Sequence, residues 1–74
     1  MDALMNEILK HLTPKQKAVY LLRQQGLSQL QVAAELETSQ GYVSLAERKA
    51  NEIVNGYLKV AKIAVDLAER KGSA

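Results

Sequence analysis

The chain has 74 residues, no cysteine and a formal net charge of +2. A chain of this length forms one small domain, and the absence of cysteine excludes disulfides and thiolate metal sites. No apolar run approaches the ~20 residues that span a bilayer, so a membrane protein is excluded and a cytoplasmic, nucleoid-associated location is expected.

The composition predicts an all-α fold. Hydrophobic residues make up 47% of the chain, but three tyrosines are its only aromatic residues, so the core must be aliphatic. Leucine and alanine are strong helix formers, and the alternation that is typical of strands is absent. A monomer of this size buries only about 60% of its unfolded surface, which makes oligomerisation an expected source of stability.

The first two predicted helices lie on either side of a strong break. The first covers about residues 2–11, where apolar side chains recur at helical spacing. The second begins after Thr13, because Thr13 can cap it, Pro14 suits its first position and Gln16 completes a capping box. Gly26 can end this helix in a left-handed conformation.

A helix-turn-helix is predicted over about residues 28–50. Ser28 and Gln31 repeat the capping pattern at the start of the third helix, and a turn follows at 37–39. The fourth helix runs from about residue 40 to 70, because no proline interrupts it. Small or apolar residues occupy the positions where the two helices must touch. These residues are Val32, Ala33, Leu36, Val43 and Ala46.

The start of the fourth helix has the character of a DNA recognition helix. In a helix-turn-helix, the outward positions at the start of the second helix face the bases of the major groove. The predicted base contacts are Ser39, Gln40, Gly41, Ser44 and Arg48. Gln40 suits adenine, Arg48 suits guanine, and Leu45 can touch a thymine methyl group. The alternative for each polar residue is a solvated helix start.

Donors to phosphate are expected around this helix. The predicted phosphate contacts are Lys15, Lys17, Ser28, Gln29, Tyr42 and Lys49. Residues 10–50 hold six basic and three acidic residues, and this local excess favours phosphate. Arg23 is instead expected to pair with Glu35 or to be a surface charge. The single His11 is expected on the surface, because a zinc site needs more ligands.

The rest of the fourth helix carries a heptad seam and is predicted to form a homodimer. The seam consists of Ala46, Ala50, Ile53, Tyr57, Val60, Ala64 and Leu67. The predicted dimer interface consists of Ile53, Tyr57, Val60, Ala61, Ala64 and Leu67. A second apolar stripe beside the seam makes the face wide for a two-stranded coil. The first helix is the alternative partner. Gly56 suggests a bend or a close helix crossing.

Five short motifs, taken in order, resemble two groups of DNA-binding proteins. The motifs are Leu-Thr-Pro-Lys-Gln at 12–16, Gly-Leu-Ser-Gln at 26–29, Val-Ala at 32–33, Val-Ser at 43–44 and Glu-Arg-Lys-Ala at 47–50. The chain resembles the archaeal Tfx-type regulators and, more loosely, the fourth region of bacterial primary sigma factors. The resemblance covers residues 12–56 and implies a helix-turn-helix that reads promoter or operator DNA.

The chain departs from these groups at three points. Glu37 occupies a turn position that is often glycine in helix-turn-helix proteins. Ala46 replaces the usual large aliphatic residue before the glutamate of the recognition helix. The first residues of that helix lack the arginine of many relatives.

These observations predict a sequence-specific regulator of transcription that binds double-stranded DNA. The expected form is a single domain, residues 1–74, that represses as a homodimer through about residues 53–70. Its half-sites would lie about 34 Å apart. The alternatives are a sigma-like module that contacts RNA polymerase or another regulator, and a nonspecific, architectural or partition DNA-binding protein. No catalytic residues, metal or cofactor are expected, because no nucleophile, paired base or phosphate loop is present.

Overall fold

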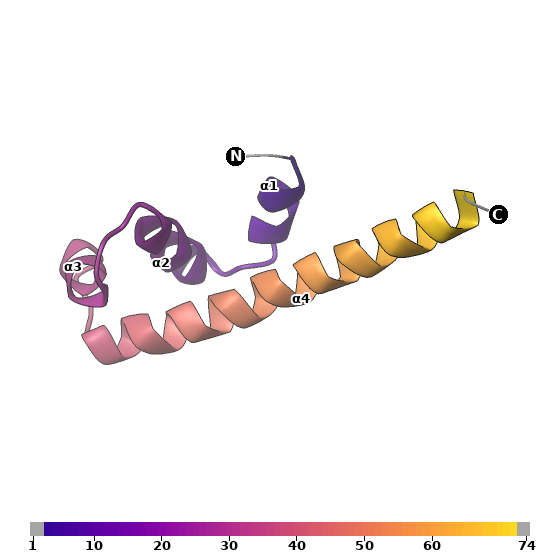
Figure 1. Ribbon diagram of the computed structural model, residues 1–74. Coiled ribbons are helices and arrows are strands. Elements are labelled where there is room, and N and C mark those ends of the chain that lie inside the picture. The colour runs from indigo at the N-terminus through magenta and orange to yellow at the C-terminus, as the bar shows by residue number, and fades with distance from the viewer. Residues whose placement is uncertain (1–2, 73–74) are drawn as a thin grey trace.

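Four helices form the structure, a computed structural model that describes the backbone of residues 3–72 and the side chains of residues 3–69 (Figure 1). They are α1 (Ala3–Leu9), α2 (Pro14–Gln24), α3 (Gln29–Glu35) and α4 (Gln40–Gly72). No strand occurs within residues 3–72. The predicted all-α fold with a long C-terminal helix is therefore confirmed.

Both predicted capping boxes are present. The Thr13 hydroxyl accepts a hydrogen bond from the Gln16 amide, and the Gln16 side chain accepts one from the Thr13 amide, both at 3.1 Å. Ser28 and Gln31 repeat this exchange at 3.1 and 2.8 Å. These bonds satisfy amides that the first turn of a helix leaves without partners, so they determine where α2 and α3 begin.

The first helix is shorter than predicted. It ends at Leu9 instead of His11, and Asp2, its expected start, lies outside the described residues. The amides of His11 and Leu12 bond to carbonyls three residues back, at 3.0 and 3.2 Å, so the chain tightens into a turn. Thr13, which precedes Pro14 and caps α2, is extended (φ −64°, ψ 159°), so residues 10–12 form the turn that joins the two helices.

Left-handed residues end the second and third helices. Gly26 has φ of 95°, as predicted, and the Leu27 amide bonds back to the Leu22 carbonyl at 3.3 Å. Glu37 has φ of 54° at the equivalent place, and the Thr38 amide bonds to the Ala33 carbonyl at 2.9 Å. Both are Schellman ends, but only the first has the glycine that this conformation favours.

Two clusters of buried side chains hold the helices together, and α4 contributes to both. One cluster joins α2, α3 and α4 and consists of Val19, Val32, Ala33, Val43 and Ala46. The other joins α1, α2 and α4 and consists of Ile8, Leu9, Leu12, Tyr20, Ala50 and Val54. The buried positions of α4 are therefore 43, 46, 50 and 54, which follow the helical period.

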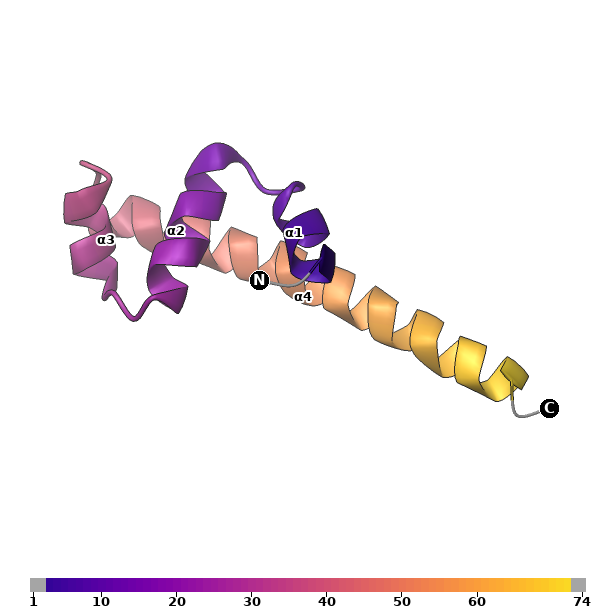
Figure 2. The ribbon, with the colours of Figure 1, turned by 90° about the horizontal axis from the view of Figure 1, so that it is seen from above.

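The second half of α4 extends beyond the other helices. Figures 1 and 2 show α1, α2 and α3 gathered on its first half. The molecule is 54 Å long and about 20 Å wide, and its radius of gyration is 15.4 Å. A compact chain of this length would have about 11 Å. Of the two alternatives for Gly56, a bend or a close helix crossing, the crossing does not occur within the described chain, because a Cβ atom at Gly56 would meet nothing within 4 Å.

Replacing Ala33 by leucine should destabilise the fold. Ala33 is buried between α2, α3 and α4, and overpacking a site of this kind costs about 1–3 kcal/mol. Urea denaturation measures the change, and Ala34→Leu is the matched control because Ala34 is exposed on the same helix. Equal stability of the two variants would contradict the observed packing of α3.

Replacing Glu37 by glycine should stabilise the fold by about 0.5–1 kcal/mol. Glycine adopts the left-handed conformation of residue 37 without the clash that a Cβ atom brings. Glu35→Gly is the control, because Glu35 is helical and glycine there should lower stability by about 1 kcal/mol. Thermal unfolding reports both, and a loss of stability in Glu37→Gly would argue against a left-handed turn.

Candidate nucleic-acid interface

The first turns of α4 present an exposed polar face. The Ser39 hydroxyl accepts a hydrogen bond from the Tyr42 amide at 3.1 Å and so caps the helix. Val43 and Ala46 point into the core, which turns the opposite side of the helix outward. All five predicted base-contact residues are exposed on α4 or at its start. They are Ser39, Gln40, Gly41, Ser44 and Arg48.

The side chains on this face are available to a ligand. The side chains of Gln40, Ser44 and Arg48 make no hydrogen bond or ion pair with the described part of the chain. A Cβ atom at Gly41 would meet nothing within 4 Å, so no packing within the chain requires glycine there. Leu45 lies on the same side and is 41% exposed. The face therefore combines free polar groups with one apolar contact.

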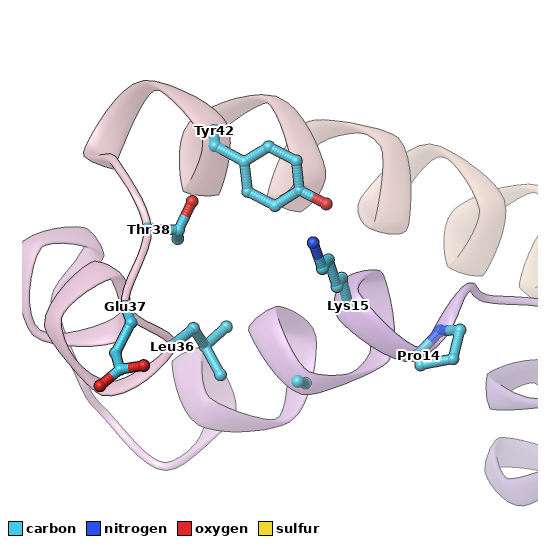
Figure 3. A pocket seen from close by; sticks show the side chains of 7 residues that line it. Pro14, Lys15, Leu36, Glu37, Thr38 and Tyr42 are labelled. Carbon is cyan, nitrogen blue, oxygen red and sulfur yellow. The ribbon is translucent and has the colours of Figure 1, made fainter.

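One flank of this face is formed by α4 and the start of α2. Tyr42 and Lys15 lie across a hollow of about 290 Å³, and the Lys15 ammonium is 5.5 Å from the Tyr42 ring (Figure 3). A second hollow, of about 170 Å³, reaches from Tyr42 to Lys49. Three predicted phosphate contacts thus lie together. Lys17 is exposed on α2 but lines neither hollow.

The start of α3 forms the other flank. Ser28 is exposed, with its hydroxyl engaged in the capping box. The Gln29 side chain is partly buried and donates a hydrogen bond to Glu47 at 2.8 Å. These two predicted phosphate contacts are therefore held next to α4, on a different side from Lys15 and Tyr42.

A three-residue bridge, Arg23–Glu47–Gln29, connects α2, α3 and α4. The Arg23 guanidinium is hydrogen-bonded to Glu47 and also donates to the Leu27 carbonyl at 2.7 Å. Glu47 accepts from Gln29 with its other oxygen. The predicted pairing of Arg23 with Glu35 is therefore wrong. Arg23 lies in the last turn of α2, where it faces α4.

The bridge lowers the pKa of the Glu47 carboxyl. Burial alone would raise this pKa, but hydrogen bonds from Arg23 and Gln29 and the charge of Arg23 outweigh it. Glu47 belongs to a motif of the resemblance, yet its structural role was not predicted. The sequence offered only one indication of this role: Glu47 is an acidic residue directly after Ala46, a position expected to be buried against the preceding helix.

The predicted dimer residues lie in different environments. Ile53 packs against the cluster of α1, α2 and α4, and Ala61 is half-buried. Val60, Ala64 and Leu67 are exposed. Tyr57 stacks on the ring of His11, with a centroid distance of 4.5 Å. His11 is exposed, as predicted.

The described residues do not group in the way that metal sites require. No set of three histidine, cysteine, aspartate or glutamate side chains comes together within residues 3–69. Within the same part of the chain, no helix is long and apolar enough to cross a membrane.

One comparison with known proteins gives a match. The family model for sigma-70, region 4, matches residues 3–44, which is more than half of the chain. The match covers α1, α2, α3 and the start of α4, and it stops before the projecting half of α4. No curated protein and no solved structure matches the chain at a significant level.

Stability should fall in acid because of Glu47. Because the pKa of Glu47 is lower in the folded chain than in the unfolded chain, the ionised carboxylate adds stability at neutral pH. This contribution decreases once the pH falls below about 4.3, the ordinary pKa of glutamate, and is lost as the pH falls through the lower pKa of the folded state. Glu47→Gln should cost about 1–2 kcal/mol at pH 7 and much less at pH 3. Urea denaturation at both pH values measures this, with exposed Glu35→Gln as control. An equal loss at both values would contradict the ionic role of Glu47.

Proposed function

The chain belongs to the sigma-70 region 4 family, a family of DNA-binding helix-turn-helix domains, and we propose that it is a sequence-specific regulator of transcription. In this proposal α3 and the start of α4 are the helix-turn-helix, and α4 enters the major groove. The finer likeness to archaeal Tfx-type regulators is part of the proposal.

The observation that carries this proposal is the free polar face between two flanks of donors. A protein that docks through apolar anchors would present aromatic or aliphatic residues at its tip. The tip of α4 presents mainly polar side chains: those of Gln40, Ser44 and Arg48 have no partner within the described chain, and Tyr42 and Leu45 are the exposed apolar side chains beside them. Polar side chains that are free and ordered by a rigid helix suit the hydrogen-bonding edges of bases.

Each residue of this face has a proposed role. Gln40 forms a bidentate contact with adenine and Arg48 with guanine, since these side chains match the groups on those bases. Ser39 and Ser44 bond to base edges, and Leu45 touches a thymine methyl group. Gly41 lets the backbone approach the DNA, which its open surroundings favour.

The two flanks are proposed to hold the two phosphate strands that border the groove. Lys15, Tyr42 and Lys49 serve one strand. Lys17 is exposed on α2 outside both hollows, so its contact with phosphate stays a prediction from the sequence. Ser28 and Gln29 serve the other strand. The Glu47 side chain, by bonding to Gln29, keeps this flank at a fixed distance from the recognition face.

We further propose that the protein acts as a homodimer and as a repressor. The apolar residues of the projecting half of α4 are exposed from Tyr57 to Ala68, apart from half-buried Ala61, and a second copy would cover them. A protein that occupies promoter DNA obstructs RNA polymerase, which makes repression the simplest outcome of binding.

Selection from a random pool of duplexes, followed by sequencing and titration in increasing salt, tests the proposed function. The expected result is an enriched motif, with affinity that falls about 5-fold to 150-fold in Gln40→Ala. Gln24→Ala is the matched control, because Gln24 is exposed on α2 away from the face. Lys15→Ala should instead weaken all sequences alike and lower the salt dependence.

Two other results would contradict the proposal. Salt-dependent binding without an enriched motif would indicate a nonspecific DNA-coating protein. No binding at low salt would overturn both DNA-binding functions and direct the search to a protein partner.

A further inference from the structure

Lys15 of α2 and Tyr42 of α4 are in contact on one flank of the polar face. The Lys15 ammonium lies over the Tyr42 ring, 5.5 Å from its centroid, at the hollow between the two helices (Figure 3). This separation is within the distance of about 6 Å at which an aromatic ring attracts a cation. Each residue was predicted separately to contact phosphate, so the contact between them connects two predicted roles.

The backbone holds both side chains at defined places. Lys15 is the second residue of α2, and the capping box at Thr13 determines where that helix begins. Tyr42 is the third residue of α4, and its amide donates a hydrogen bond to the Ser39 hydroxyl at 3.1 Å. The next residue, Val43, has no exposed surface. The contact therefore joins two capped first turns, one of which is anchored in the core.

The Lys15 ammonium keeps its charge available for a ligand. It is exposed and makes no hydrogen bond or ion pair with the described part of the chain. Glu37 lines the same hollow, but its carboxylate points away from Lys15 (Figure 3). A carboxylate partner would have to be released before Lys15 could bind a phosphate, whereas an aromatic ring leaves the positive charge in place. Because an ammonium has three N–H groups, the ring can hold one side while another N–H donates to a phosphate oxygen.

The ring also limits the motion of the lysine side chain. Lysine has a flexible four-carbon stem, which loses rotamer freedom when a ligand holds it in one place. The loss of this freedom at the moment of contact weakens binding. A lysine that already lies over a ring has less freedom to lose. The Tyr42 ring can therefore strengthen binding to phosphate without touching the DNA.

Lys49 provides a comparison within the same flank. Tyr42 lines both hollows, while Lys15 lines one of them and Lys49 the other. Of these two lysines, only Lys15 lies over a ring within the described residues. The effect of the ring should therefore be coupled to Lys15 and independent of Lys49.

We propose that Tyr42 is a positioning residue, whose ring holds the Lys15 ammonium where it binds a phosphate beside the major groove. The hydroxyl group of Tyr42 is not required for this role. The inference rests on the proposed DNA-binding function and replaces a direct phosphate contact of Tyr42 with one that acts through Lys15.

NMR of the free protein tests the contact without DNA. An aromatic ring shifts the resonances of protons that lie over its face upfield. The Lys15 Hε protons should therefore resonate upfield of those of Lys17, which is exposed on the same helix and lines neither hollow. The upfield shift should persist in Tyr42→Phe and disappear in Tyr42→Leu. Equal Lys15 shifts in the original chain and in Tyr42→Leu, with unchanged helical content, would overturn the proposal.

Binding to a short duplex of random sequence at low salt tests the role. Tyr42→Leu should weaken binding about twofold to fivefold, which is the effect of one exposed contact between a cation and a ring. Tyr42→Phe should bind like the original chain, because it keeps the ring. In a Lys15→Ala chain, Tyr42→Leu should have no further effect, whereas in a Lys49→Ala chain it should have its full effect.

The outcomes distinguish this inference from the proposed function. Equal losses in Tyr42→Phe and Tyr42→Leu would overturn the inference and assign the phosphate contact to the hydroxyl group, with DNA binding intact. Additive losses in Tyr42→Leu and Lys15→Ala would also overturn it, because the two residues would then act independently. No binding by the original chain would overturn the proposed function, and the inference with it.

Discussion

The burial of one side of α4 against α2 and α3 determines where the remaining residues of that helix point. Val43 has no exposed surface, and Ala46 and Ala50 continue the same buried line. A helix advances by 100° per residue, so fixing this line fixes every other position around the axis. Gln40, Ser44 and Arg48 face outward as a consequence of the core, and Tyr42 and Lys49 face the start of α2 for the same reason.

The bridge of Arg23, Glu47 and Gln29 complements this core, because the buried side chains alone are few and mostly small. Valine and alanine side chains hold neighbouring helices in place only through close packing, and several of the buried side chains here are alanine. Directional hydrogen bonds from two other helices to one carboxylate add an angular constraint that aliphatic packing lacks. The polar face at the start of α4 is thus held in place by a small core and one polar anchor.

The sequence predicted the features that depend on local chemistry. Capping boxes at Thr13 and Ser28 and the left-handed Gly26 each require only a few neighbouring residues, and all three are present. The partner of Arg23 was not predictable in this way, because it depends on how α2 and α4 are rotated against each other. Glu35 and Glu47 are both acidic, and only the tertiary arrangement decides between them.

In the candidate site, too, the features set by one helix were predictable from the sequence and those set by contacts between helices were not. Helical spacing was sufficient to place Gln40, Gly41, Ser44 and Arg48 on one face, because that face lies on a single helix, and Ser39 precedes it as the cap. The convergence of Lys15 with Tyr42 needed the structure, since these residues come from different helices. For Gly56 the sequence left a bend and a close helix crossing open, because a glycine within a helix looks the same in sequence whether or not another helix approaches it, and the structure brings no other helix close to it.

One helix thus carries two surfaces, a polar face at its start and an apolar surface at its end, separated by the part that packs in the core. The central claim is that the polar face is the part that meets DNA. An NMR titration of the ¹⁵N-labelled protein with a short duplex at low salt tests this directly. The account predicts chemical-shift changes at residues 39–49, 28–29 and 15, with residues 57–69 unaffected. Changes confined to residues 57–69, or no changes at all, would contradict it.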